Sequence, residues 1–304
     1  MKYAYKLFFV LSIFFIAIIS SCEIYNPAEP IPAYIHIDKI TLAKNFSGFP
    51  NSTTGDEGSL SHKITDAWVY IDEQLIGCFE LPVTFPVLYE GSHVIRIKAG
   101  IKVNGIAATR APYPFYNDFS QTITLEKGSK ITVAPSVVYN SNTHFAIMEN
   151  FEAAGNNMVK TIYSDTTLQI ITSPDPNVFE GNLPNSTHSG IAYLDATPTH
   201  HKFECTSVDS FLLPKGGASV FLELNYKANY SFTVGVIAKG SASTTQFAAL
   251  SFNPSATWNK GYVNLTPIIS GAYSADNYKI TIGMINNNNA DSLAILLDNI
   301  KLVY

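Results

Sequence analysis

The feature that most constrains the fold is the alternation of apolar and polar residues, which recurs along most of the chain while helical periodicity is almost absent. Residues 33–42, AYIHIDKITL, alternate and predict a first strand. In the next alternating segment Val69 and Ile71 share one face, and Trp68 and Tyr70 share the other. Short strands separated by turn signals predict antiparallel sheets packed as sandwiches, so we expect an all-β chain.

Two further segments predict paired strands. Residues 92–106 should contain two strands that turn near Gly100, because glycine commonly marks a turn. Residues 121–135 should form a hairpin whose turn is Glu126–Ser129.

The N-terminus predicts export and lipid attachment. Lys2 and Lys6 precede an apolar run, residues 7–19, that is shorter than the ~20 residues of a membrane-spanning helix. The run therefore predicts a signal peptide over residues 1–21. The following order, Ile-Ser-Ser-Cys ending at Cys22, resembles the lipobox of bacterial lipoproteins, in which the cysteine becomes lipidated.

Residues 22–32 predict a tether between the lipid and the folded part. The three prolines Pro27, Pro30 and Pro32 favour an extended, stiff spacer. Together with the lipobox resemblance, this implies an outer-membrane lipoprotein of Bacteroidota type, anchored through Cys22. Surface lipoproteins of that phylum often carry acidic residues after the cysteine. With only Glu23 and Glu29 here, the cell surface and the periplasmic face both remain open.

Charge and cysteine content restrict partners and cross-links. The formal net charge is −5, and Arg96 and Arg110 are the only arginines, which argues against nucleic acid as a partner. Besides Cys22, the cysteines are Cys78 and Cys205. A disulfide between them would clamp the two predicted domains together; we expect two separate buried thiols instead, because free cysteine packs as a small apolar side chain.

The first domain, residues 33–140, carries a resemblance. Residues 69–100, with V-Y-I-D, I-G and G-S-H-V-I-R-I elements, are similar to PEGA-type and related small Ig-like modules of bacterial envelope proteins. The resemblance implies a small Ig-like β-sandwich.

The second domain, residues 145–304, carries another. Phe151-Glu152, the WNKGYVNL segment at 258–265 and the LDNIKL segment at 297–302 resemble the galactose-binding-like jelly roll of carbohydrate-binding modules. The resemblance implies two antiparallel sheets packed face to face, with the first and last strands adjacent. It also places Trp258 in the core.

The jelly-roll resemblance implies a possible structural calcium between the opening segment and the last strand. Its oxygen ligands would come from Glu149, Glu152 and Asp298. The alternative is that Asp298 caps a turn or bonds backbone while both glutamates are solvated. No other cofactor is implied.

The THHKFEC segment, residues 199–205, contains residue types found in zinc sites. His200 and His201 would point to opposite sides of a strand, so we expect solvated histidines there. The chain also lacks a G-x-S-x-G elbow, an H-E-x-x-H helix and a glycine-rich phosphate loop, and we expect no enzyme.

Aromatic residues supply the candidate binding surface. Trp68 and Tyr70 could lie on an outward sheet face, and the loop RAPYPFYNDF contributes Tyr113, Phe115 and Tyr116. Loops usually lie on the surface, so we expect this loop to be exposed. Exposed, it would form a patch suited to a protein partner; buried, it would plug the interior.

Three functions compete at this stage. The first is an accessory subunit of an outer-membrane complex for secretion, barrel assembly or nutrient import, with a β-barrel or other envelope protein as partner. The second is a surface glycan-binding lipoprotein that uses its jelly roll. The third is a hydrolase with an unrecognised site. We expect the first.

Overall fold

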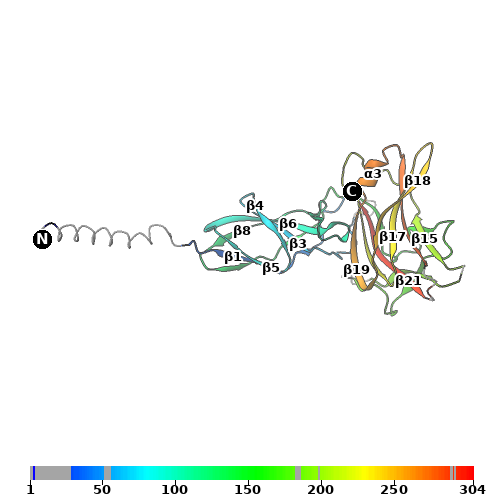
Figure 1. Cartoon of the computed structure of the whole chain (residues 1–304), viewed down its shortest axis with the longest axis horizontal. Coiled ribbons are helices and arrows are strands. Elements are labelled where there is room, and N and C mark those ends of the chain that lie inside the picture. The colour runs from blue at the N-terminus through cyan, green and yellow to red at the C-terminus, as the bar shows by residue number, and fades with distance from the viewer. Residues whose placement is uncertain are drawn as a thin grey trace.

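In the computed structural model, two β-sandwiches follow one another along the long axis of the molecule (Figure 1). The structure describes residues 3, 29–50, 56–181, 186–197, 199–287, 290 and 292–304. The predicted signal peptide, the lipidated Cys22 and most of the tether lie outside these residues. Within the described part, no helix combines the length and apolar character needed to cross a bilayer.

The first sandwich comprises one sheet of order β5-β1-β9, one of order β4-β3-β6-β7 with β8 also on β6, and a β10-β2 pair. The strands of the first two sheets are β1 (Ala33–Ile37), β3 (Asp66–Ile71), β4 (Gln74–Glu80), β5 (Val83–Val87), β6 (Gly91–Lys102), β7 (Arg110–Pro112), β8 (Phe119–Leu125) and β9 (Lys130–Thr132). The pair is β2 (Thr41–Leu42) and β10 (Ser136–Val137). Val69 and Ile71 face its core, as the alternation predicts.

Two local predictions for this sandwich are wrong. β6 runs uninterrupted through Gly100, which lies against Asp66 of β3 rather than in a turn. A Cβ at Gly100 would stand 2.9 Å from the Cβ of Asp66, so the glycine permits close strand approach. The turn at Glu126–Ser129 exists, but β8 pairs with β6 and β9 pairs with β1, so these strands form no hairpin.

The second sandwich packs a six-stranded sheet, β13-β14-β21-β16-β19 with β11 on β21, against a five-stranded sheet, β12-β15-β20-β17-β18. The six strands are β11 (Phe145–Glu149), β13 (Gln169–Thr172), β14 (His188–Leu194), β16 (Phe221–Ala228), β19 (Ser255–Asn264) and β21 (Leu293–Val303). The five are β12 (Met158–Lys160), β15 (Lys202–Ser207), β17 (Phe232–Lys239), β18 (Thr244–Phe252) and β20 (Asn277–Ile285). A short helix, α3 (Thr266–Gly271), follows β19. The first and last strands, β11 and β21, pair antiparallel, which confirms the predicted adjacency.

The first sandwich covers part of the outer face of the six-stranded sheet, whereas Tyr193 on β14 of that sheet remains 48% exposed. Phe221, Tyr262 and Val303 point away from the core of their own sandwich and pack into the core of the first one. The core of the first sandwich therefore extends onto side chains of the second, a region we call the shared core, and the outer face of the five-stranded sheet is left for other contacts.

A buried polar cluster, which we call the interface cluster, lies at this junction. The Glu223 carboxylate accepts hydrogen bonds from the hydroxyls of Tyr113 at 2.7 Å and Tyr139 at 2.8 Å. Lys260 Nζ lies 2.9 Å from the same carboxylate, and Lys301 Nζ donates to the Ser59 carbonyl at 2.6 Å. These contacts join charged groups of the second sandwich to polar groups of the first.

Burial and charge oppose each other in the interface cluster. Burial disfavours ionised Glu223, but the charges of Lys260 and Lys301 hold the pKa of its carboxyl below the usual value. Burial lowers the pKa of Lys301 to about 7. Burial and the nearby Glu223 charge raise the pKa of Tyr113 and Tyr139 well above the usual value.

The expectation of an exposed aromatic loop is therefore wrong. Tyr113, Phe115 and Tyr116 are 2%, 6% and 7% exposed, and Tyr113 packs edge-on against Phe221 of the second sandwich. The loop fills the junction because its rings extend the shared core while the Tyr113 hydroxyl satisfies a buried carboxylate.

Candidate functional site

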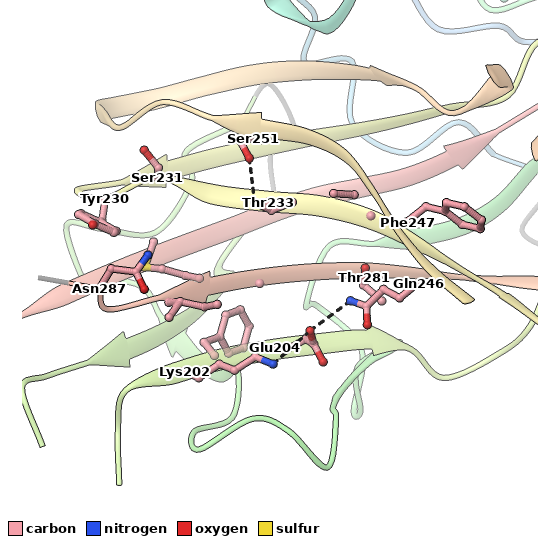
Figure 2. Close-up of a pocket in the computed structure, with 16 residues that line it drawn as sticks. Lys202, Glu204, Tyr230, Ser231, Thr233, Gln246, Phe247, Ser251, Thr281 and Asn287 are labelled. Atoms are coloured by element: carbon pink, nitrogen blue, oxygen red, sulfur yellow. Dashed lines mark hydrogen bonds and ion pairs between the residues drawn. The ribbon is translucent and has the colours of Figure 1, made fainter. Parts of the chain in front are cut away.

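The outer face of the five-stranded sheet forms a groove of about 700 Å³ (Figure 2). It is lined by residues of β15, β17, β18 and β20, with Tyr230 and Ser231 before β17 and Asn287 after β20. A volume of this size falls in the range of small-ligand sites in proteins, ~300–1,000 Å³. We call this feature the groove.

Strand alternation places the lining residues. In β17 Val234 and Val236 face the core, so Thr233 and Gly235 face outward. The strand register places Thr233 beside Gly283 of β20. Glu204 of β15 lies on the other side of Gly283, and Ser251 of β18 lies on the other side of Thr233, so the four residues form a row across four strands. The row carries one carboxylate and two hydroxyls, and its glycine has no side chain. The row is therefore polar, and its side chains leave space above the sheet.

Two glycines form the floor of the groove. A Cβ at Gly235 would lie 2.5 Å from the Phe247 carbonyl oxygen and 2.8 Å from Thr281 Oγ1. A Cβ at Gly283 would lie 3.2 Å from the Phe203 carbonyl oxygen. The floor is therefore backbone, and its depth depends on the absence of side chains at these two positions.

Glu204 is the centre of the polar network in the groove. Its Oε1 accepts from Thr161 Oγ1 at 2.7 Å. Its Oε2 accepts from Gln246 Nε2 at 3.2 Å (Figure 2). Lys202 Nζ lies 3.6 Å from the same Oε2. Because β15 and β18 are separated by β20 and β17, the contact with Gln246 spans the sheet and shows that its outer face is concave.

Aromatic rings stand at the margins of the groove. Tyr230 lies at the end near Asn287 (Figure 2). Tyr163, in the loop between β12 and β13, is 65% exposed and its ring centroid lies 5.4 Å from Lys202 Nζ. Tyr230 and Phe247 are both partly buried against the core, so each presents only part of its ring. Polar groups at the centre and rings at the margins, of which Tyr163 is exposed, suit a ligand that has both hydroxyls and apolar faces.

The residues proposed from the sequence as a binding surface lie elsewhere. Trp68 and Tyr70 share the outer face of β3 in the first sandwich, as expected, but both are half-buried. The guanidinium of Arg96 covers the Tyr70 ring, 4.2 Å from its centroid. None of these aromatics, nor the loop residues at the junction, lines the groove.

The three carboxylates proposed as calcium ligands accept hydrogen bonds from protein groups. Glu149 accepts from the backbone N–H groups of Phe151 and Asn157, and Glu152 accepts from residues 187 and 188. Asp298 accepts from Ser189 Oγ at 2.6 Å and from the next backbone N–H. Burial raises the pKa of Asp298 to about 8, and the charges of both glutamates add to this effect.

The three carboxylates do not fit a calcium site because they form no metal-binding group. Each oxygen of Glu149, Glu152 and Asp298 accepts a hydrogen bond from the protein, and these bonds hold the carboxylates in place. No group of three or more His, Cys, Asp or Glu side chains within the described residues has a metal-binding arrangement. The alternative prediction, in which Asp298 bonds backbone, matches the structure; the prediction of solvated glutamates is wrong for Glu149, which is 3% exposed.

The THHKFEC segment divides between two faces. Glu204 faces the groove, whereas Cys205 belongs to the core. Cys205 and Cys78 are both free thiols, which confirms that they do not pair, although Cys78 is only half-buried.

Sequence reasoning missed the groove residues. The outward Thr233 and Gly235 within an otherwise apolar strand are the available signal, because a small, polar outward face distinguishes this strand from an ordinary buried one. The partner of Glu204, Gln246, lies 42 residues further along the chain, and only the fold brings the two together.

No known family model matches the chain, and no curated protein matches it in sequence. Among solved structures, it resembles a Clostridium thermocellum xylanase 10B fragment with CBM22-1 and GH10 modules, complexed with xylohexaose, at 14% identity and TM-score 0.38. That match covers 52% of this chain and 28% of the xylanase fragment.

Two further structures are similar over most of their own length. One is the CBM22-2 xylan-binding domain of Paenibacillus barcinonensis Xyn10C, at 11% identity and TM-score 0.36, covering 51% of this chain and 97% of the domain. The other is a carbohydrate-binding module of the β-sandwich superfamily, at 12% identity and TM-score 0.36, covering 91% and 100%. At TM-scores this low, the resemblances say what the chain is similar to and nothing about what it binds.

Proposed function

We propose that this protein is a non-catalytic, lipid-anchored glycan-binding protein of the bacterial outer membrane and that it holds a polysaccharide segment in the groove. The observation that carries the proposal is the composition of the groove. A carboxylate, amides, hydroxyls and a lysine converge over a glycine floor, with Tyr163 and Tyr230 at the rim. Sugar hydroxyls match the hydrogen-bonding groups, and the apolar faces of pyranose rings match the aromatic rings.

The same composition favours binding over hydrolysis. Cleavage of glycosides usually requires two carboxyl groups, one on each side of the scissile bond. Among the described residues that line the groove, Glu204 is the only carboxylate. Its hydrogen bonds with Thr161 and Gln246 hold it in place as an acceptor for ligand hydroxyls.

The location within the cell rests on the N-terminal sequence. The signal peptide and the lipidated Cys22 would anchor the protein in the outer membrane, and the first sandwich would hold the groove away from the lipid. The PEGA-like, Ig-like character of the first sandwich belongs to the same proposal.

The experiment that tests the proposal is isothermal titration of the mature protein, in detergent, with mixed-linkage β-glucan, xylan, glucomannan, mannan and starch. We expect at least one polysaccharide to bind, and Glu204→Gln and Tyr230→Ala each to weaken that binding by about tenfold or more. The matched control is Tyr193→Ala, because Tyr193 is 48% exposed on β14 of the opposite sheet. Binding that survives the groove variants, or falls equally in the control, would overturn the assignment.

Catalysis is tested separately. Chromogenic glycosides and esters incubated with the protein should be hydrolysed no faster than in buffer. Hydrolysis that is lost in Glu204→Gln would make the groove an active site and would refute the non-catalytic part of the proposal.

The accessory-subunit hypothesis relied on the aromatic loop as an exposed contact surface for a protein partner. Tyr113, Phe115 and Tyr116 are buried, so the loop does not provide that surface. A pull-down from gently solubilised outer membranes, with a tag after Tyr304, distinguishes the two functions. Elution without a β-barrel partner is expected for a glycan-binding protein, and co-elution at fixed stoichiometry would restore the subunit hypothesis.

A further inference from the structure

A second cavity, of about 200 Å³, lies where the two sandwiches meet. The first sandwich contributes Lys63, Lys102 and Asn104, and the second contributes Lys260, Tyr262 and the end of β18. One water occupies ~30 Å³ of liquid, so the cavity has room for a tetrahedral ion or a charged substituent. We call it the lysine pocket.

The charge of the lysine pocket is positive. Three lysines line it, and no aspartate or glutamate does so among the described residues. Two of the lysines pair with carboxylates that do not line the pocket: Glu80 lies 2.8 Å from Lys102 Nζ, and Glu223 lies 2.9 Å from Lys260 Nζ. Lys63 Nζ donates instead to the uncharged Asn259 Oδ1 at 2.7 Å.

The ammonium group of Lys260 points to a missing acceptor. Its side chain is 3% exposed, and the buried Nζ makes no hydrogen bond of normal geometry although Glu223 lies beside it. An ammonium group carries three donors, and buried donors are costly when they lack acceptors. An oxyanion in the pocket would accept from this group.

Lys63 and Lys102 would also be stabilised by an anion in the pocket. Partial burial and the charge of Lys102 lower the pKa of Lys63, so these two like charges oppose each other. The Lys102–Glu80 pair is solvent-exposed at 26% and 53%, and exposed pairs contribute little. An anion between the lysines would relieve their repulsion and receive charge-assisted hydrogen bonds.

The lysine pocket adjoins the groove. Ser251 of β18 lines both cavities. A glycan in the groove that extends past β18 would therefore reach the lysines with its substituents.

We propose that the lysine pocket binds a small oxyanion, namely a sulfate, phosphate or carboxylate group, carried either by a free ion or by an acidic sugar. Lys63, Lys102 and Lys260 provide the charge, and the pocket uses residues from both sandwiches. This site is separate from the groove and does not depend on glycan binding there.

Titration calorimetry of the mature protein with sodium sulfate and sodium phosphate, at constant ionic strength in chloride, tests the site. Lys63→Met should weaken binding by about tenfold or more, because it removes one of the three charges and leaves the interface cluster intact. Lys239→Met, an exposed lysine at the end of β17, is the matched charge control and should bind as the unmodified protein does. Melting curves of both variants check that they are folded.

A second arm separates the two sources of the anion. Glucose 6-sulfate and glucuronate are titrated beside glucose, with Lys63→Met and Glu204→Gln as variants. Binding of free sulfate that Lys63→Met weakens, and Glu204→Gln leaves unchanged, identifies an ion site. Binding of the acidic sugars alone, lost in Lys63→Met, identifies an acidic glycan as the ligand. Absence of binding for all of these anions, or equal loss in Lys63→Met and Lys239→Met, would overturn the proposal.

Discussion

The second sandwich contains two glutamate–lysine pairs, one on each sheet, whose surroundings differ. Glu223 and Lys260, in the interface cluster, are 0% and 3% exposed and lie 2.9 Å apart. Glu204 and Lys202, in the groove, are 11% and 31% exposed and lie 3.6 Å apart. Both pairs arise from outward-facing strand positions, and they differ in whether the other sandwich covers the sheet.

This contrast teaches how one kind of residue pair serves two purposes. The Glu223 carboxylate of the covered pair also accepts hydrogen bonds from Tyr113 and Tyr139, so this group is committed to the fold. The uncovered pair keeps donors and acceptors facing solvent, where a ligand can use them. We therefore expect changes at Glu223 to alter stability and changes at the uncovered pair to alter binding of a ligand in the groove.

The largest expected effect is that of Glu223→Gln. Removing this charge leaves Lys260 and Lys301 without their buried counter-charge and should lower the free energy of unfolding by ~3–5 kcal/mol. Urea denaturation measures it. The matched change, Glu204→Gln, should cost less than ~1 kcal/mol because its ion pair is partly exposed. Equal losses at the two positions would remove the distinction between the pairs.

A smaller loss is expected for Tyr139→Phe. The Tyr139 hydroxyl lies within hydrogen-bond distance of both oxygens of Glu223, and a hydrogen bond to a charged group contributes ~1.5–3 kcal/mol. The control is Tyr89→Phe, whose hydroxyl makes an exposed contact with Gln74 and whose loss should stay within ~0.5 kcal/mol. If both variants unfold at the same urea concentration, the interface cluster contributes no more than a surface contact.

The pH dependence of stability isolates Lys301. Its pKa is about 7 in the folded protein, against 10.5 for the unperturbed group, so above pH 7 the unfolded chain binds more protons. The free energy of unfolding should then rise with pH, by at most ~1.4 kcal/mol per unit, up to pH 10.5. In Lys301→Met this rise should be absent, and urea titrations at pH 7, 8 and 9 compare the two. A constant difference across that range would contradict the lowered pKa.

The smallest effect on stability is expected for Gly283→Ala. The added methyl would lie 3.2 Å from the Phe203 carbonyl oxygen and 3.7 Å from Glu204 Cβ, which small shifts can accommodate at a cost of ~1 kcal/mol or less. It would also raise the floor of the groove and weaken polysaccharide binding. Gly271→Ala, where the methyl meets no atom within 4 Å, is the control and should leave binding unchanged. Unchanged binding in Gly283→Ala would place the ligand elsewhere.

The fold class was predictable because strand alternation is a local property of the sequence. Val69 and Ile71 point inward, as the alternation around them predicts. The interruption expected at Gly100 was wrong because the reason for that glycine lies across the sheet, at Asp66. Strand pairing between segments that are distant in sequence produces no recognisable pattern within either segment.

The site was less predictable for a related reason. Tyr113 looks like any loop aromatic until the second sandwich covers it, and Glu204 looks like any surface carboxylate until sheet curvature brings Gln246 to it. Exposure of a loop and assembly of a groove both depend on contacts between segments far apart in sequence. The amino-acid composition indicates neither whether the loop is exposed nor where the groove forms.

The shared core has a consequence for how such a chain could be recombined. Phe221, Tyr262 and Val303 belong by connectivity to the second sandwich and by packing to the first. A cut near residue 140 would expose these apolar side chains on one fragment and the rings of the aromatic loop on the other. We therefore expect the two sandwiches to be transferable to another protein only together: a gene fusion that took the second sandwich alone would need polar replacements for the side chains that the first sandwich covers.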